Sequence, residues 1–231
     1  LEATGSTRVQ ERIHTGAGPP ATEREGRAEL AAAWHERDTG DGPGERRVQI
    51  LQMLAAMLEN PRGEKVTTAA LAGRLDVSEA ALYRHFASKA QMFEGLIEFI
   101  ETTLFSLVNK IQSETADGIA QAEQIVATLL AFAEKNPGMT RVLIGDALVN
   151  EDERLQARMN QLYEKLEASL RQSIRVAQMG NSWHGDAAAD AAVLFAFAMG
   201  RWQLFAKSGF KRDPVELWGR QWRQLMEGAA A

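Results

Sequence analysis

Apolar residues recur every three or four positions along almost the whole chain after Gly44, and no strand-like alternation survives. The first such stripe runs from Leu51 to Leu58 and stops before Asn60-Pro61. This spacing places the apolar side chains on one face of an α-helix. The pattern therefore predicts an all-α protein.

Two short helices are expected after the first one. Thr67 and Ser78 are typical N-cap residues, and Asp76 tolerates the left-handed backbone of the turn between them. Helices of barely two turns are not stable alone, so packing must hold them. Their inner faces consist of Leu71, Ala72, Leu75, Leu82 and Phe86.

A long helix is predicted from Ser88, because Gln91 three residues later completes a capping box. Its buried stripe consists of Phe93, Leu96, Ile100, Leu104, Leu107 and Ile111. The further helices are expected over 116–134, 137–149, 152–178, 187–206 and 214–226. Asp213-Pro214 is a start signal for the last of these.

These elements define two domains after an N-terminal extension. Residues 1–44 are rich in Gly and Pro and are predicted to be disordered, although 28–36 could form a short helix. Residues 45–90 form a helix-turn-helix domain, and residues 91–228 form a larger helical regulatory and dimerisation domain.

The net charge of −5 is unevenly distributed. Between Gly44 and Met92 seven basic and five acidic side chains give +2, which leaves −7 for the rest of the chain. A mildly basic block on an acidic body is compatible with a protein that contacts phosphate at one end.

The sequence predicts a cytoplasmic protein that is not inserted in a membrane. No apolar run reaches the length of a membrane span, and the first forty residues contain no apolar core of a signal peptide. The chain has no cysteine, which excludes disulfides and thiolate chemistry.

Catalysis is not expected, nor is a cofactor or a metal. The four histidines, His14, His35, His85 and His184, do not have the spacing of metal ligands. No nucleophile motif or phosphate-binding loop occurs. Asp146, Glu151, Asp152 and Glu153 are interpreted as a solvated helix start.

The segment from Thr67 to Phe86 has the layout of a DNA-binding helix-turn-helix. Its second helix would enter the major groove of double-stranded DNA with its small leading residues close to the base edges. Helix capping alone would explain any one of the polar residues in this segment. It would not explain why the polar residues lie together on one face. The expected DNA-binding residues are Thr67, Thr68, Ser78, Glu79, Ala80, Ala81, Tyr83, His85 and Lys89.

Val77 to Lys89 reads V-S-E-A-A-L-Y-R-H-F-A-S-K and resembles the DNA-binding domain of TetR-type repressors. The chain is more similar still to the SlmA family of nucleoid occlusion factors within that superfamily. This likeness extends through Leu96 to Glu101, Asn136 to Gly138 and Asn160 to Leu162, and spans roughly residues 46–226. It implies a TetR-like fold and a nucleoid-associated homodimer.

The resemblance also implies a protein partner, the C-terminal tail of the division protein FtsZ. In the family this tail docks between the long helix and the next one, at positions that correspond to Phe99, Thr128, Ala131 and Lys135. At Leu107 the family pattern has a basic residue, so one electrostatic contact is expected to be missing. The implied function is a DNA-bound antagonist of FtsZ polymerisation.

A dimer interface is predicted on the last two helices. The helix over 187–206 is apolar on nearly every side, and such a helix must be covered all round. A second copy would complete a four-helix bundle, although part of this surface belongs to the intramolecular core. The expected interface residues are Phe195, Met199, Trp202, Trp218 and Trp222.

Two alternatives stay open. A ligand-responsive TetR-type repressor would keep the same DNA-binding domain, but no inward polar cluster marks an effector pocket, and Met139, Met159 and Met179 are interpreted as core residues. A helical interaction protein without DNA binding is the third possibility. Whether dimers associate further on DNA is left open by the sequence.

Overall fold

The computed structural model describes residues 43–60 and 66–229, and every regular element within these ranges is helical. The all-α prediction is confirmed. The predicted extension over 1–44 lies outside the described residues up to residue 42, and Pro43 and Gly44 already belong to the first described helix.

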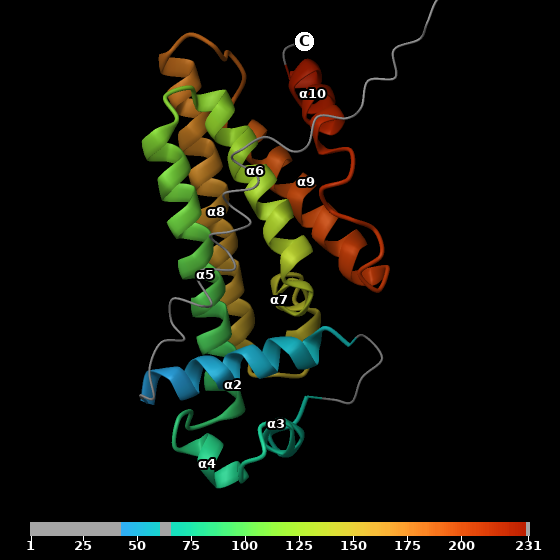
Figure 1. Ribbon diagram of the computed structural model, residues 1–231. Helices are drawn as coiled ribbons and strands as arrows, with labels where there is room; N and C mark the ends of the chain where they lie inside the picture. The colour runs from blue at the N-terminus through green and yellow to red at the C-terminus, as the bar shows by residue number, and fades with distance from the viewer. Residues whose placement is uncertain (1–42, 61–65, 230–231) are drawn as a thin grey trace, which may run out of the picture.

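Three helices form what we call the head: α2 (Pro43–Leu58), α3 (Thr68–Arg74) and α4 (Glu79–Tyr83). Helix α2 crosses one end of the long helices, and α3 and α4 lie on its far side (Figure 1). The buried residues of α3 are Leu71 and Ala72, and that of α4 is Leu82, as their spacing predicted.

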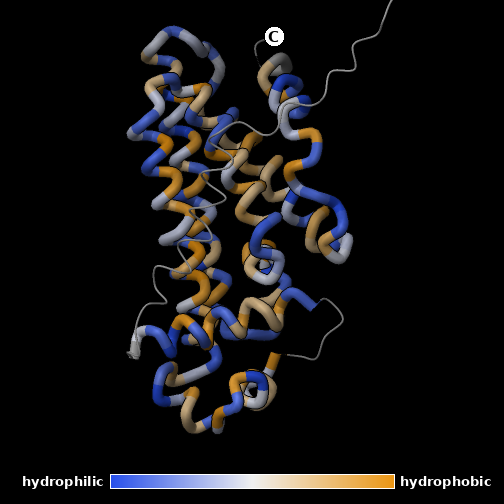
Figure 2. The backbone as a smooth tube through the Cα atoms, viewed as in Figure 1, coloured by the Kyte–Doolittle hydropathy of each residue, from blue (hydrophilic) through white to orange (hydrophobic). Residues whose placement is uncertain are grey.

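The remaining helices form the body. They are α5 (Lys89–Glu114), α6 (Gly118–Lys135), α7 (Pro137–Leu143), the 3-10 helix η1 (Asp146–Leu148), α8 (Glu153–Met179), α9 (Ala187–Lys207) and α10 (Trp218–Ala229). Helices α5, α6, α8 and α9 pack into one bundle, and α10 lies at the end opposite the head (Figure 1). Figure 2 shows hydrophobic and hydrophilic positions alternating along these helices, and one core cluster runs from Ile50 in α2 to Trp222 in α10.

The joint between head and body is a contact of two main chains. A Cβ atom on Gly138 of α7 would lie 2.0 Å from the carbonyl oxygen of Ala55 in α2, so only glycine allows this approach. The guanidinium of Arg141 also donates to the carbonyl of Leu58 at 3.3 Å. The head is therefore packed directly on α7.

Two predicted helices differ from those observed. The helix expected over 137–149 ends at Leu143, because Gly145 adopts a left-handed φ of 79° before the separate turn of η1. The last helix begins at Trp218 rather than Pro214, because Leu217 is left-handed with φ 68°. Arg201 holds this irregular segment by donating to the carbonyls of Asp213, Pro214 and Glu216.

One predicted core residue was wrong. Met139 and Met159 are buried, but the side chain of Met179 is 77% exposed at the end of α8. Met179 lies two positions after the buried Ala177, so its side chain points away from the buried stripe of α8.

Candidate DNA-binding interface

The two short helices are fixed by their own caps. The hydroxyl of Thr67 accepts a hydrogen bond from the amide of Ala70 at 3.1 Å, and that of Ser78 accepts from Ala81 at 3.2 Å. Asp76 adopts the expected left-handed backbone, with φ 53°. Because this residue reverses the chain between α3 and α4, the helix-turn-helix forms from local signals.

The leading end of α4 presents small side chains. Ser78, Glu79 and Ala80 are exposed, and Ala81 is half-buried. Tyr83, one turn further along, has 45% of its surface exposed. A helix with such an end can bring its backbone close to base edges in a major groove.

A chain of hydrogen bonds joins α3 and α4 across this surface. The hydroxyl of Thr68 donates to the carboxylate of Glu79 at 2.6 Å. The phenol of Tyr83 in turn donates to the hydroxyl oxygen of Thr68 at 3.4 Å. Three of the predicted DNA-binding residues are therefore brought together.

An arginine of α2 holds the opposite end of α4. The guanidinium of Arg47 lies 4.1 Å from the centre of the Phe86 ring and donates to the carbonyl of His85. This cation–π contact adds to the burial of Phe86, which is 1% exposed. The sequence did not predict this contact of Arg47, because a contact over 38 positions leaves no local signal.

Lys89 lies at the boundary between head and body. Its ammonium forms an ion pair with Glu151, which belongs to the loop between η1 and α8, and it lies 5.6 Å from the centre of the Phe93 ring. The side chain that was predicted to contact phosphate is thus paired with a carboxylate in the described structure. Glu151 was not predicted to have a role at this site.

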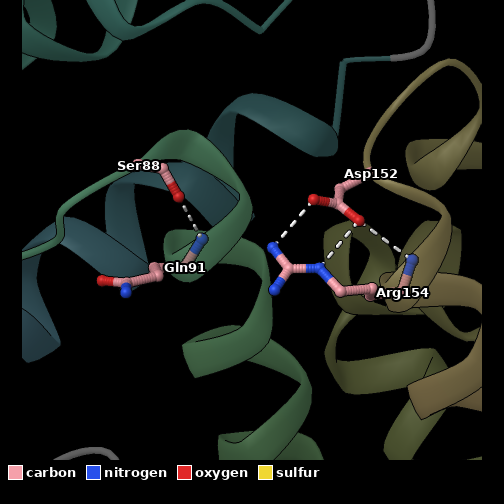
Figure 3. A network of polar contacts seen from close by, with 4 residues as sticks. All are labelled: Ser88, Gln91, Asp152 and Arg154. Atoms are coloured by element: carbon pink, nitrogen blue, oxygen red, sulfur yellow. Dashed lines mark hydrogen bonds and ion pairs between the residues drawn. The ribbon is translucent and has the colours of Figure 1, made fainter.

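The starts of α5 and α8 are capped in similar ways by Ser88 and Asp152 (Figure 3). The hydroxyl of Ser88 accepts from the amide of Gln91, and the carboxylate of Asp152 accepts from the amide and guanidinium of Arg154. The side-chain and backbone hydrogen bonds from Arg154 lower the pKa of Asp152. The capping box of α5 is displaced by one residue, because Gln91 accepts from the amide of Ala87.

The residues assigned to the FtsZ tail lie on two helices that pack together. Phe99 on α5 is 5% exposed, whereas Thr128 and Ala131 on α6 are half-buried. Lys135 is exposed and forms an ion pair of 3.6 Å with Glu134. Leu107, where the resemblance led us to expect a missing electrostatic contact, is 8% exposed.

The predicted dimer residues are largely covered by their own chain. Trp202 is fully buried and its Nε1 donates to the carbonyl of Leu129 at 3.0 Å, while Phe195 is 5% exposed. Trp218 and Trp222 are also buried, with 8% and 7% of their surface exposed, and Met199 is half-buried. Helix α9 also has an exposed side. Its mostly small residues, which we call the small-residue face of α9, are Ala189, Ala192, Val193, Ala196, Gly200 and Leu204.

A hollow of about 270 Å³ lies between α8, α9 and α10. Its polar group is Asp190, whose carboxylate already accepts from Nε1 of Trp183 at 2.7 Å. The lining residues are Ile174, Trp183, Asp190, Val193, Leu194, Leu225 and Met226.

Three of the four acidic residues of the predicted solvated helix start pair with a basic side chain, and Glu151 is the partner of Lys89. Asp146 pairs with Lys207 at 2.5 Å, and Asp152 pairs with Arg154 at 2.8 Å. Over residues 43–60 and 66–229, no three potential metal ligands come together. Within the same ranges no helix is long and apolar enough to cross a bilayer.

Two family models match the chain. Residues 62–96 match the bacterial regulatory proteins of the tetR family, and residues 116–229 match the SlmA-like domain described as tetracyclin repressor-like, C-terminal. The first match covers α3, α4 and the start of α5, and the second covers the body from α6 to α10.

Curated relatives match most of the chain. A protein named nucleoid occlusion factor SlmA from Alteromonas mediterranea is 51% identical over 179 residues, which are 77% of this chain and 92% of the relative. A protein of the same name from a Marinomonas species is 49% identical over 185 residues, 79% of this chain and 94% of the relative.

Solved structures share the fold at low sequence identity. The fatty acid degradation regulator FadR from Bacillus halodurans superposes with a TM-score of 0.68 at 16% identity, over 82% of this chain and 98% of the regulator. The TetR family regulator PfmR from Thermus thermophilus gives 0.65 at 20% identity, over 78% and 97%. These likenesses confirm the TetR-like fold.

Proposed function

The chain belongs to the SlmA family of nucleoid occlusion factors, and on that premise we propose that it binds specific DNA sites as a homodimer and, while bound, antagonises FtsZ polymerisation over the nucleoid. The observation that carries this proposal is 51% identity over 92% of a relative with that name. The identity extends far beyond the DNA-binding domain. The chain therefore stands among DNA-binding regulators rather than enzymes.

The head supplies the DNA contacts in this proposal. Ala80 and Ala81 approach the base edges, while the hydroxyls of Thr67 and Ser78, the phenol of Tyr83 and the imidazole of His85 contact the backbone of the duplex. Lys89 contributes a phosphate contact by leaving Glu151, because a phosphate oxygen can replace the carboxylate as its partner.

The homodimer forms around α9 and α10. The small-residue face of α9 is exposed in a single chain, and small side chains at this spacing let two helices approach closely. Met199 is half-buried on the same helix, and Phe195 and Trp202 lie in the core. Trp218 contacts the ring of Phe197 on α9, and Trp222 contacts Trp218. Two heads in one dimer would contact two half-sites of a palindromic site.

The FtsZ tail docks along α5 and α6. Thr128 and Ala131 are small and half-buried, which gives a shallow surface, and Lys135 adds an exposed positive charge at the end of α6. Phe99 supports this surface from beneath. A dimer that is bound to DNA would therefore present two such surfaces near the nucleoid.

Sedimentation of FtsZ polymer tests the proposal. We expect this protein to reduce the pelleted polymer when DNA selected for binding to it is present, and much less without that DNA. Ala131→Glu places a charge on the tail surface and is expected to abolish the inhibition while DNA affinity is kept. Ala157→Glu, on an exposed position of α8, is the matched control and should behave as the wild type.

The outcome of this assay distinguishes an FtsZ antagonist from a ligand-responsive repressor. Tight DNA binding without any effect on FtsZ would leave a ligand-responsive TetR-type repressor, and would overturn the proposed antagonism. Loss of both DNA affinity and FtsZ inhibition in Ala131→Glu would show that the tail surface is misplaced.

A further inference from the structure

A carboxylate stands at the leading end of the helix that is proposed to enter the major groove. Glu79 is the first residue of α4, is exposed, and is followed by two alanines. Phosphates repel a negative charge at this position, so Glu79 lowers affinity for DNA in general. A residue with that cost is best explained by a favourable contact that only certain sequences provide.

The carboxylate is held in place before any DNA arrives. Its Oε2 accepts from the hydroxyl of Thr68 at 2.6 Å, and Tyr83 donates to the same hydroxyl oxygen at 3.4 Å. The three residues come from the start of α3 and from both ends of α4. Because these bonds already restrict the side chain, less conformational entropy is lost when it meets a base.

The chemistry of a carboxylate selects among the four bases. An ionised carboxylate only accepts hydrogen bonds. In the major groove guanine presents the acceptors N7 and O6, thymine presents O4 and a methyl group, and adenine has the acceptor N7 beside its amino group. Cytosine presents only its N4 amino donor, so it is the base that a carboxylate favours.

We propose that Glu79 is a specificity-determining residue that accepts a hydrogen bond from the N4 amino group of a cytosine in each DNA half-site. Thr68 and Tyr83 are positioning residues that orient its carboxylate. This inference rests on the proposed binding of α4 in the major groove. Its rival is a purely structural Glu79 that only joins α3 to α4.

Selection of binding sites from a pool of random DNA duplexes distinguishes a specificity-determining Glu79 from a purely structural one. We expect the wild-type protein to enrich a motif with a fixed cytosine at one position of each half-site. Glu79→Gln can still accept from Thr68 and gains an amide donor, so it should shift that position towards adenine, which pairs with glutamine through N6 and N7. Replacing the cytosine should cost the wild type roughly tenfold in affinity.

Two further variants control for charge and for orientation. Asp76→Asn removes one negative charge from the turn before α4 and keeps a side chain that tolerates the left-handed backbone, so it should enrich the wild-type motif. Thr68→Val removes the positioning hydroxyl and should weaken discrimination at the cytosine position while the other positions keep theirs.

The results separate this inference from the proposed function. An enriched motif whose base preferences are the same for the wild type and Glu79→Gln, with a uniform change in affinity, would overturn the specificity role alone. A wild-type pool without any enriched motif would overturn sequence-specific DNA binding, and the inference with it.

Discussion

The two short helices of the head and the longest helix of the body contribute very different numbers of side chains to the core. Helices α3 and α4 have three buried residues between them, whereas α8 alone has eight. The exposed side of α3 and α4 is the surface that the proposal assigns to DNA, so few of their residues are available for packing. Helices α3 and α4 are therefore expected to open at lower free energy than the body, and to depend for their position on α2, which packs on α7.

Removal of a large side chain from the body core should have the largest effect. Trp202 is fully buried and hydrogen-bonded to Leu129, so Trp202→Ala should cost about 3–5 kcal/mol of unfolding free energy. Denaturant unfolding followed by circular dichroism measures this. Leu82→Ala in the head should instead abolish DNA binding while most helical signal is kept, and loss of the body's helices in that variant would contradict the comparison.

A methyl group in the joint should have the next largest effect. Gly138→Ala would force α7 away from the Ala55 carbonyl and should cost about 1–3 kcal/mol or more, as overpacking does. Gly73→Ala in α3, where nothing lies within 4 Å of the new Cβ, should instead stabilise the chain by about 0.5–1 kcal/mol. Equal effects of the two alanines would show that the joint can relax.

A smaller effect, which depends on pH, is expected at Tyr163 in α8. Its hydroxyl donates to the carbonyl of Leu143, and burial raises its pKa to about 12 from 10. Because the folded pKa is the higher one, the contribution to stability is present below pH 10 and is lost as the pH rises towards 12. Tyr163→Phe should lose about 1 kcal/mol at pH 7.

Unfolding midpoints measured from about pH 8, which is below both pKa values, up to about pH 12 check this. The difference between the wild type and Tyr163→Phe should shrink above pH 10. A constant difference over that range would mean that the phenol is not desolvated in the body.

The smallest effect is expected at the ion pair of Lys89 and Glu151, at the end of the body next to the head. Glu151→Gln removes the carboxylate that competes with phosphate for Lys89, and should raise DNA affinity about two- to fivefold, which is the range of a partly exposed ion pair. Glu153→Gln removes the same charge from an exposed neighbour and is the matched control. Equal gains from both would show that only net charge matters.

Local signals made the helices and their starts predictable. Thr67, Ser78 and Ser88 cap the helices that they were expected to cap, and Asp76 makes the expected turn, because each feature depends on a few neighbouring residues. The family resemblance could also be found in the sequence, because the motif from Val77 to Lys89 is one continuous segment. The family models confirmed it.

Long-range contacts explain what the sequence did not predict. The break before Trp218 depends on Arg201, which reaches the carbonyls of a segment more than ten residues away. The apolar pattern of α9 identified a helix that must be covered, but did not say which side its own chain covers and which side it leaves exposed. The pairing of Lys89 with Glu151 spans 62 positions and has no local pattern.

The contact between Gly138 and Ala55 has a consequence for the spacing of DNA sites. Side chains can adapt by changing rotamer, but two main chains in direct contact cannot, so the head has little freedom to swing on the body. In a dimer the separation of the two reading helices would then be fixed by the α9 interface. Each inserted base pair moves a half-site by about 3.4 Å and rotates it around the duplex. Palindromes with one base pair more or fewer between their halves should therefore be poor sites.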